Sequence, residues 1–113
     1  MPEIYLSVVI PAYNEEKRIA ATLRDVADYL GKQNFASEII LMDDGSSDQT
    51  VKVARDLNIS ALRIVDNPGN HGKGYVVRQG MLEARGAYRL FMDADNSTKI
   101  QEIEKFWPYF KKG

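Results

Sequence analysis

Short apolar runs alternate along this chain with longer stretches in which apolar residues recur at helical spacing. Ile4 to Ile10 is an apolar run rich in β-branched residues that stops at Pro11, as expected of a strand buried on both faces. A helix is predicted next, with Asn14 as its N-cap, Glu15 and Glu16 in its first turn, Gly31 at its end, and one apolar face made of Ile19, Leu23, Val26, Ala27 and Leu30.

The same strand-then-helix pattern occurs three more times. Glu38 to Met42 precedes a helix face of Val51, Ala54 and Leu57; Ala61 to Val65 precedes a helix over Lys73 to Arg85; Tyr88 to Met92 precedes a helix bearing Ile100, Ile103, Trp107 and Phe110. Such alternation predicts an α/β fold, an open parallel sheet of four βα units with helices on both faces. We expect one domain over residues 1–113.

Composition excludes several classes of protein. The chain has 113 residues, 44% hydrophobic and 27% charged, with a formal net charge of −1. This make-up is typical of a globular domain and provides no cationic excess for nucleic acid. No cysteine is present, which excludes disulfides and a cysteine nucleophile, and no signal-peptide pattern begins the chain. We therefore expect a cytoplasmic protein.

Ligands of open α/β sheets bind beyond the carboxyl ends of the strands, so the turns there are the candidate sites. The turn from Pro11 to Glu15 contains no glycine, which argues against a dinucleotide fingerprint and a P-loop. A hard cation that bridges phosphate to carboxylates is another way to hold a diphosphate. Asp93 and Asp95 follow an apolar strand and suit Mg²⁺ or Mn²⁺, although acidic residues here could also be only turn or capping residues.

Four segments in order carry a resemblance over essentially the whole chain: SVVIPAYNEEKRI, EIILMDDGSSDQT, NHGKGYVVRQGMLEARG and LFMDADNSTK. Together they resemble family 2 of the inverting nucleotide-sugar glycosyltransferases, which have the GT-A fold and a D-x-D motif. Within that family the sequence looks most like dolichyl-phosphate glucose synthases, with the mannose synthases next. The resemblance implies the Rossmann-like, nucleotide-binding half of a GT-A fold.

The resemblance also implies roles for individual residues. Pro11, Ala12, Tyr13 and Glu15 would surround the nucleoside, with Asp44 facing the base and Ala94 also at the nucleotide. Tyr13 can stack on a base, and an ionised carboxylate can accept an N–H from uracil or guanine, whereas the corresponding ring nitrogen of cytosine carries no hydrogen. Asp44 alone therefore does not separate a uridine from a guanosine donor.

On the phosphate side, the resemblance implies that Asp95 binds the metal and that Asp93 reaches the ribose or a metal-bound water. These two are the expected catalytic residues, with Ser97 as a further candidate ligand. Lys73 is our candidate for added positive charge on the phosphates. The reaction implied is transfer of a hexose, with UDP-glucose favoured, to an acceptor such as a polyprenyl phosphate, with inversion.

Family members are about twice this long, so we expect only the donor half here, inactive alone and able to self-associate around Phe106, Trp107 and Phe110. The full-length protein could lie at the cytoplasmic membrane face. A non-catalytic nucleotide-sugar-binding module is the alternative. A nucleotidyltransferase is disfavoured because the first turn is neither glycine-rich nor basic.

The remaining polar and glycine residues of these turns have structural interpretations. Asp43 is expected to be structural, and His71 to be solvated or to hydrogen-bond within its loop, with a phosphate contact as the alternative. Gly72 is expected to permit a tight turn, and Gly80 to let its helix approach the sheet.

Overall fold

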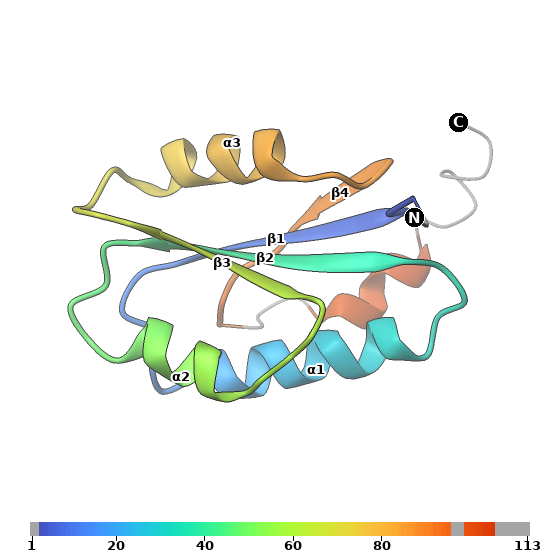
Figure 1. The fold of residues 1–113 in the computed structure, drawn as a ribbon, viewed down its shortest axis with the longest axis horizontal. Coiled ribbons are helices and arrows are strands. Elements are labelled where there is room, and N and C mark those ends of the chain that lie inside the picture. The colour runs from blue at the N-terminus through green and yellow to red at the C-terminus, as the bar shows by residue number, and fades with distance from the viewer. Residues whose placement is uncertain (1–2, 96–98, 106–113) are drawn as a thin grey trace.

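The computed structural model describes residues 3–95 and 99–105. Within these residues, four strands form one parallel sheet in the order β3-β2-β1-β4 (Figure 1). The elements are β1 (Leu6–Ala12), α1 (Ile19–Gly31), β2 (Ser37–Asp44), α2 (Thr50–Asp56), β3 (Leu62–Asn67), α3 (Lys73–Glu83), β4 (Tyr88–Phe91) and the 3-10 helix η1 (Ile100–Lys105). The predicted fold class, an open parallel sheet of βα units, is confirmed.

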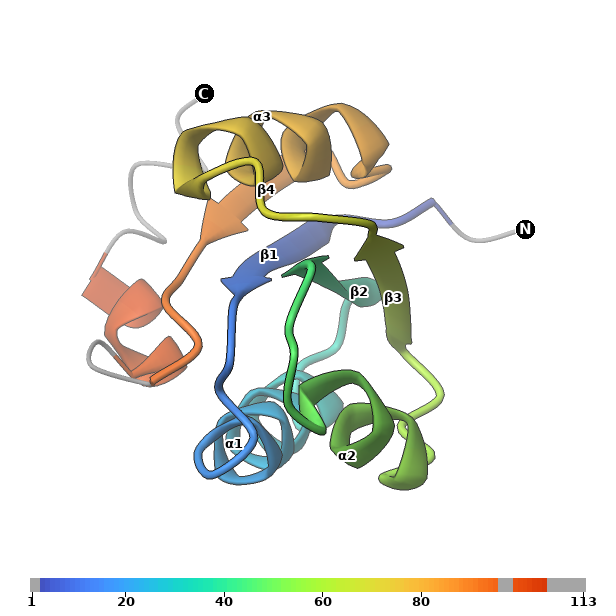
Figure 2. The same ribbon diagram turned by 90° about the vertical axis from the view of Figure 1, so that its left-hand side faces the viewer.

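Helices cover both faces of the sheet, as Figure 2 shows: α3 lies on one face, and α1, α2 and η1 lie on the other. The larger apolar core lies under α1 and includes Ile19, Leu23 and Ile103, whereas a smaller cluster under α3 includes Val76 and Ala84. The two central strands are consequently buried on both faces, with Leu6–Ile10 and Ile39–Met42 at 0% exposure.

The first helix begins later than predicted, and the prediction that Asn14 caps it is wrong. The helix α1 starts at Ile19, so Glu15 and Glu16 precede it and its first turn holds no acidic residue. Asn14 has a φ of 53°, and its Oδ1 accepts backbone N–H groups of the next strand-end turn, at 2.8 Å from Ser47. A contact between two turns therefore replaces the expected local cap.

Two further boundaries differ from the prediction. Strand β1 continues through Pro11 to Ala12, where it pairs with β2 but no longer with β4. Proline lacks a donor and is tolerated because one side of the strand needs none there. The described part of the fourth helix is a 3-10 helix that buries Ile100 and Ile103, while Trp107 and Phe110 lie outside the described residues.

Gly80 confirms the expected close approach of its helix to the sheet. A Cβ built there would lie 2.9 Å from Met42 Cγ and still closer to Val9 Cγ1, both in the sheet. Only a residue without a side chain fits at this crossing.

A buried carboxylate that the sequence analysis did not identify joins α3 to the amino ends of the strands. Glu38 is 6% exposed and accepts hydrogen bonds from Ser7 Oγ at 2.6 Å, the Arg85 amide at 2.7 Å and Arg63 Nη2 at 3.3 Å. Burial raises the pKa of Glu38, but these hydrogen bonds outweigh it and hold the pKa below its ordinary value. The group is thus a charged structural link, at the sheet edge opposite the strand-end turns.

Candidate active site

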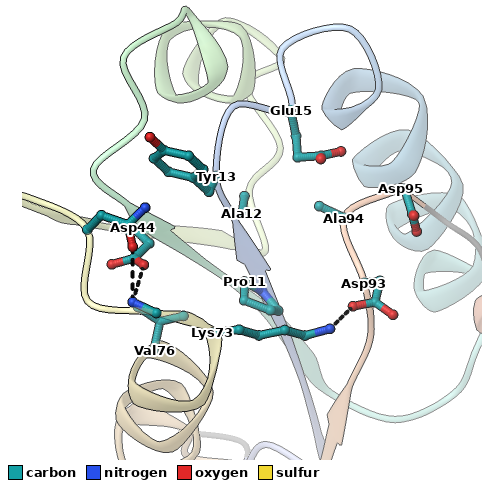
Figure 3. A pocket seen from close by; sticks show the side chains of 12 residues that line it. Pro11, Ala12, Tyr13, Glu15, Asp44, Lys73, Val76, Asp93, Ala94 and Asp95 are labelled. Carbon is teal, nitrogen blue, oxygen red and sulfur yellow. Dashed lines mark hydrogen bonds and ion pairs between the residues drawn. The ribbon is translucent and has the colours of Figure 1, made fainter.

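A pocket of about 310 Å³ opens at the carboxyl edge of the sheet (Figure 3). All four strand-end turns contribute to it, through Pro11, Ala12, Tyr13, Glu15, Asp44, Asn70, Gly72, Lys73, Val76, Asp93, Ala94 and Asp95. Every candidate site residue in the described part of the chain is therefore brought together, whereas Ser97 lies outside it. Their individual roles remain predictions.

The first two turns are held together by reciprocal hydrogen bonds. The Glu15 amide donates to Thr50 Oγ1 at 2.9 Å, and the Gln49 amide donates to Glu16 Oε2 at 2.9 Å. Asp48 accepts the Glu16 amide at 3.2 Å. These bonds hold the turn that carries Tyr13, a residue exposed at the pocket. Preorganisation of this kind lowers the entropy lost on binding.

Asp44 ends β2 and holds the third turn. Its side chain is nearly buried, and its two oxygens accept the His71 and Gly72 amides, each at 2.8 Å. His71 Nδ1 lies 3.4 Å from the same carboxylate, and its ring stacks on Tyr75. Burial raises the pKa of Asp44, but the hydrogen bonds from the loop lower it further, below its ordinary value. The His71 side chain is exposed to solvent, as predicted, and its hydrogen bonds reach Asp44 at the end of β2; the alternative, a phosphate contact, stays a prediction.

Asp43 is structural, as expected. It is 1% exposed and its carboxylate accepts the Ser46 amide at 2.9 Å and the Ser46 hydroxyl at 2.6 Å, which closes the turn after β2. The carboxylate is therefore occupied within its own turn.

Lys73 crosses the pocket to the fourth turn. Its Nζ lies 2.6 Å from Asp93 Oδ1 (Figure 3). The same ammonium lies 5.1 Å from the centre of the Phe91 ring. Both partners of this ion pair are well exposed, so solvent screens it and makes it readily exchangeable. A diphosphate that enters here would meet the ammonium directly.

The turn Asp93-Ala94-Asp95 is anchored from α1. Thr22, a polar residue at 1% exposure, donates its hydroxyl to the Ala94 carbonyl at 2.6 Å. The helix η1 begins only at Ile100, so neither carboxylate occupies its N-cap position. Thr22 could not be recognised from the sequence as an anchor of this turn, because its partner lies 72 residues away.

Glu15 has an unsatisfied acceptor at the pocket. Its Oε1 accepts Arg18 Nη2 at 2.7 Å, whereas its Oε2 is buried and has no hydrogen-bond partner among the described residues. Buried polar atoms almost always have a partner, so this oxygen is suited to a ligand donor.

The donor set fits a cation held jointly with a ligand. Within residues 3–95 and 99–105 there is no group of three or more His, Cys, Asp or Glu side chains that could hold a metal by itself. Of the carboxylates that line the pocket, Asp93 and Asp95 stand in the same turn, after β4. Mg²⁺ is commonly held by one or two carboxylates together with substrate phosphates, so these residues are compatible with Mg²⁺ or Mn²⁺ once a diphosphate is present.

Three pocket residues were not predicted to line it. Asn70 and Gly72 belong to the loop that Asp44 holds, and Gly72 has a φ of 93°, consistent with the expected tight turn. Val76 lies three residues after Lys73 on α3, on the same helix face, so helical spacing from Lys73 could have identified it.

Comparison with known proteins identifies the family. Residues 7–113 match the family described as "Glycosyl transferase family 2". The chain belongs to glycosyl transferase family 2. The resemblance stated from the four sequence segments is thereby confirmed.

Relatives and solved structures agree with this membership. The dolichyl-phosphate beta-glucosyltransferase of Saccharomyces cerevisiae is 46% identical where it aligns, and the match covers 91% of this chain and 33% of the yeast protein. Staphylococcus aureus TarS 1-349 in complex with UDP-GlcNAc matches with a TM-score of 0.78 at 27% identity, covering 96% of this chain and 32% of TarS. A Mycobacterium tuberculosis glucosyl-3-phosphoglycerate synthase was solved with Mn²⁺, UDP and phosphoglyceric acid. It matches with a TM-score of 0.66 at 28% identity, and the match covers 80% of this chain and 33% of the synthase.

The chain spans about a third of the length of the curated relatives it matches. None of the helices in the described residues is long and apolar enough to cross a membrane. The aromatic residues expected to support self-association, Phe106, Trp107 and Phe110, lie outside the described residues.

Proposed function

We propose that the pocket binds a nucleoside-diphosphate sugar, UDP-glucose in preference, together with Mg²⁺ or Mn²⁺. The observation that carries this proposal is the convergence of Tyr13, Lys73 and the carboxylates Asp93 and Asp95 in one pocket at the carboxyl edge of the sheet. The names of the curated relatives, dolichyl-phosphate beta-glucosyltransferases, support glucose as the sugar and a dolichyl-type phosphate as the acceptor.

On the nucleoside side, the Tyr13 ring is 46% exposed and offers a stacking surface for the base. Asp44 uses its two oxygens for backbone amides, but each carboxylate oxygen has a further lone pair with which to accept an N–H from uracil or guanine. The unsatisfied Glu15 Oε2 is an acceptor for a hydroxyl or N–H of the nucleoside.

On the diphosphate side, Asp93 and Asp95 would hold the cation, and Lys73 would exchange its ion pair with Asp93 for the phosphate oxygens. The bound cation supplies Lewis-acid stabilisation of the departing diphosphate. Lys73 adds a second positive charge on the same leaving group, which lowers the barrier to displacement at the anomeric carbon.

The acceptor is the remaining element of the proposal. A phosphate monoester has a second pKa of about 6, so a polyprenyl phosphate is already ionised near neutral pH and needs no general base. Because the chain spans about a third of its relatives, we propose that the rest of the full-length protein positions this acceptor. The chain alone would then bind donor without transfer, and the full-length protein would act at the cytoplasmic membrane face, with inversion at the anomeric carbon.

Calorimetric titration of the chain with UDP, GDP and CDP, each with and without Mn²⁺, tests the proposed binding. We expect UDP or GDP to bind with the cation, and CDP to bind at least about tenfold more weakly, a difference of roughly 1.4 kcal/mol. Equal affinities for all three nucleotides would contradict the assignment of Asp44 to the base. No binding of any nucleotide would contradict the proposed function itself.

Two substitutions of Tyr13 test the stacking role. Tyr13→Ala should weaken UDP binding roughly tenfold, within the range known for loss of base stacking, whereas Tyr13→Phe keeps the ring and should bind as wild type does. Glucosyl transfer to dolichyl phosphate by the full-length protein separates an enzyme from a non-catalytic binding module.

A further inference from the structure

The side chain of Asp44 is tied to the loop that leads into α3. It is 4% exposed, and its two oxygens accept the amides of His71 and Gly72. Its pKa, lowered below the ordinary value by these bonds despite burial, keeps the group ionised and the bonds charge-assisted. The Asp44 carboxylate thus already binds two backbone amides of the protein without any ligand.

The loop from Gly69 to Gly72 contributes little to the apolar core, because all four of its residues are exposed. Three further contacts involve this loop: the Gly72 amide approaches Asn70 Oδ1 at 3.1 Å, the His71 ring stacks on Tyr75, and the Gly69 backbone packs against Gly45, where an added Cβ would lie 3.0 Å from Gly69 Cα. Segments with few buried apolar contacts open readily unless tethered by hydrogen bonds. The two bonds to Asp44 are the charge-assisted hydrogen bonds that tie this loop to β2.

This loop ends at Lys73, the first residue of α3. Gly72 has a φ of 93°, so the chain turns sharply there, and the conformation of the loop sets the direction in which Lys73 emerges. Figure 3 shows Asp44 and Asp93 on opposite sides of the pocket, with the Lys73 side chain reaching across to Asp93.

We propose that Asp44 is a positioning residue for the diphosphate side of the pocket, acting through the His71 and Gly72 amides on the placement of Lys73. The inference rests on the proposed function, since it presumes a diphosphate ligand. It adds to base recognition a distinct role: Asp44 supports phosphate binding even by a ligand that has no base. A ligand bound beside Asp44 is thereby coupled to the position of the Lys73 ammonium on the diphosphate side of the pocket.

Inorganic pyrophosphate separates this role from base recognition. Wild type and Asp44→Asn are titrated by calorimetry with UDP and with pyrophosphate, in the cation that best supports UDP binding. Asn retains one acceptor oxygen and replaces the other with a donor, so one of the two tethers is lost. We expect the affinity for both ligands to fall at least about fivefold. The matched control is Asp66→Asn, an exposed carboxylate at the end of β3 outside the pocket, which should leave both affinities unchanged.

A fall in UDP affinity with pyrophosphate affinity unchanged would overturn the inference and leave Asp44 as a base reader only. Absence of binding of either ligand to wild type would instead overturn the proposed function, and this inference with it. Amide hydrogen exchange without ligand supplies an independent readout. In Asp44→Asn, the His71 and Gly72 amides should exchange faster while amides of β1 keep their protection; unchanged exchange of the two loop amides would also refute the tether.

Gly72→Ala keeps the Asp44 carboxylate and provides a second test if Asp44→Asn does not fold. No atom lies within 4 Å of the added Cβ, but a φ of 93° is strained for alanine, so the loop must shift. We expect UDP and pyrophosphate to weaken by the same factor in this variant. In a Lys73→Gln background, Asp44→Asn should reduce pyrophosphate affinity by less than about twofold further, because the two residues act in series. Full additivity would show that they act independently.

Discussion

Replacement of Gly80 by alanine tests the tight crossing of α3 over the sheet. The added Cβ would lie 2.9 Å from Met42 Cγ and nearer still to Val9 Cγ1, whereas carbon atoms pack best at about 3.5–4.0 Å. Val9 and Met42 are both 0% exposed, so neither side chain can move into solvent. Either α3 must lift from the sheet or the two side chains must leave their preferred rotamers.

The expected cost follows from two opposing effects. Overpacking of a well-filled core costs about 1–3 kcal/mol. Alanine in place of glycine within a helix stabilises the folded state by about 0.5–1 kcal/mol, because it loses less backbone entropy on folding. The free energy of unfolding should therefore fall by about 1–2 kcal/mol, which for a domain of this size lowers Tm by roughly 4–8 °C.

Urea unfolding and calorimetric melting measure this change, with Gly74→Ala as the matched control. Gly74 lies in the same helix, and no atom lies within 4 Å of a Cβ built on it. Its substitution should be neutral or stabilise the fold by up to about 0.5–1 kcal/mol. If Gly80→Ala were as stable as wild type or Gly74→Ala, the close helix-sheet approach would not exist as described.

Three further predictions concern charge. Burial raises the pKa of Glu38, but its hydrogen bonds outweigh burial and hold that pKa below 4.5, so the ionised group stabilises the fold fully above pH 4.5 and loses this effect as the pH falls through the pKa of the folded state. The urea midpoint of wild type should therefore decline in acid, and that of Glu38→Gln should decline less steeply. Equal dependence on pH in the two proteins would refute the structural link. Asp95→Asn should abolish most Mn²⁺-dependent UDP binding in calorimetry with Tm unchanged, because the amide lacks the charge a hard cation needs; retained Mn²⁺ dependence with a lower Tm would indicate a purely structural role. Lys73→Gln should weaken UDP binding several-fold by loss of a charge-assisted contact, whereas Lys52→Gln, which breaks an ion pair outside the pocket, should not.

The order of the elements and the location of the pocket could be predicted from the sequence. Apolar runs such as Ile39–Met42 have no polar face, so a strand made of such a run must be covered on both sides to keep its side chains out of water. Parallel strands place their carboxyl ends along one edge, so Tyr13, Asp44 and Asp93 had to lie near one another once the four units were recognised. Both conclusions depend on periodicity and connectivity, which are local or topological properties.

Contacts between distant turns could not be predicted in the same way. Asn14 has the sequence context of an N-cap, yet its side chain binds the amide of Ser47, 33 residues away. From the sequence, Glu38 is only the polar first residue of a strand. In the structure its carboxylate is buried and accepts hydrogen bonds from Ser7, Arg63 and Arg85. A short polar side chain can serve several nearby backbone groups at similar energy, and only the packed structure decides which donor reaches it.

The pocket itself illustrates the same division. The sequence by itself determined which residues stand at the strand ends and therefore which chemical groups, an aromatic ring and several carboxylates, are available there. Only the tertiary structure decided that Asp44 holds the loop before Lys73 and that Lys73 reaches Asp93. The physical reason is range: hydrophobic periodicity is encoded within a few residues, whereas hydrogen-bond partners are chosen among all groups that folding brings within about 3 Å of one another.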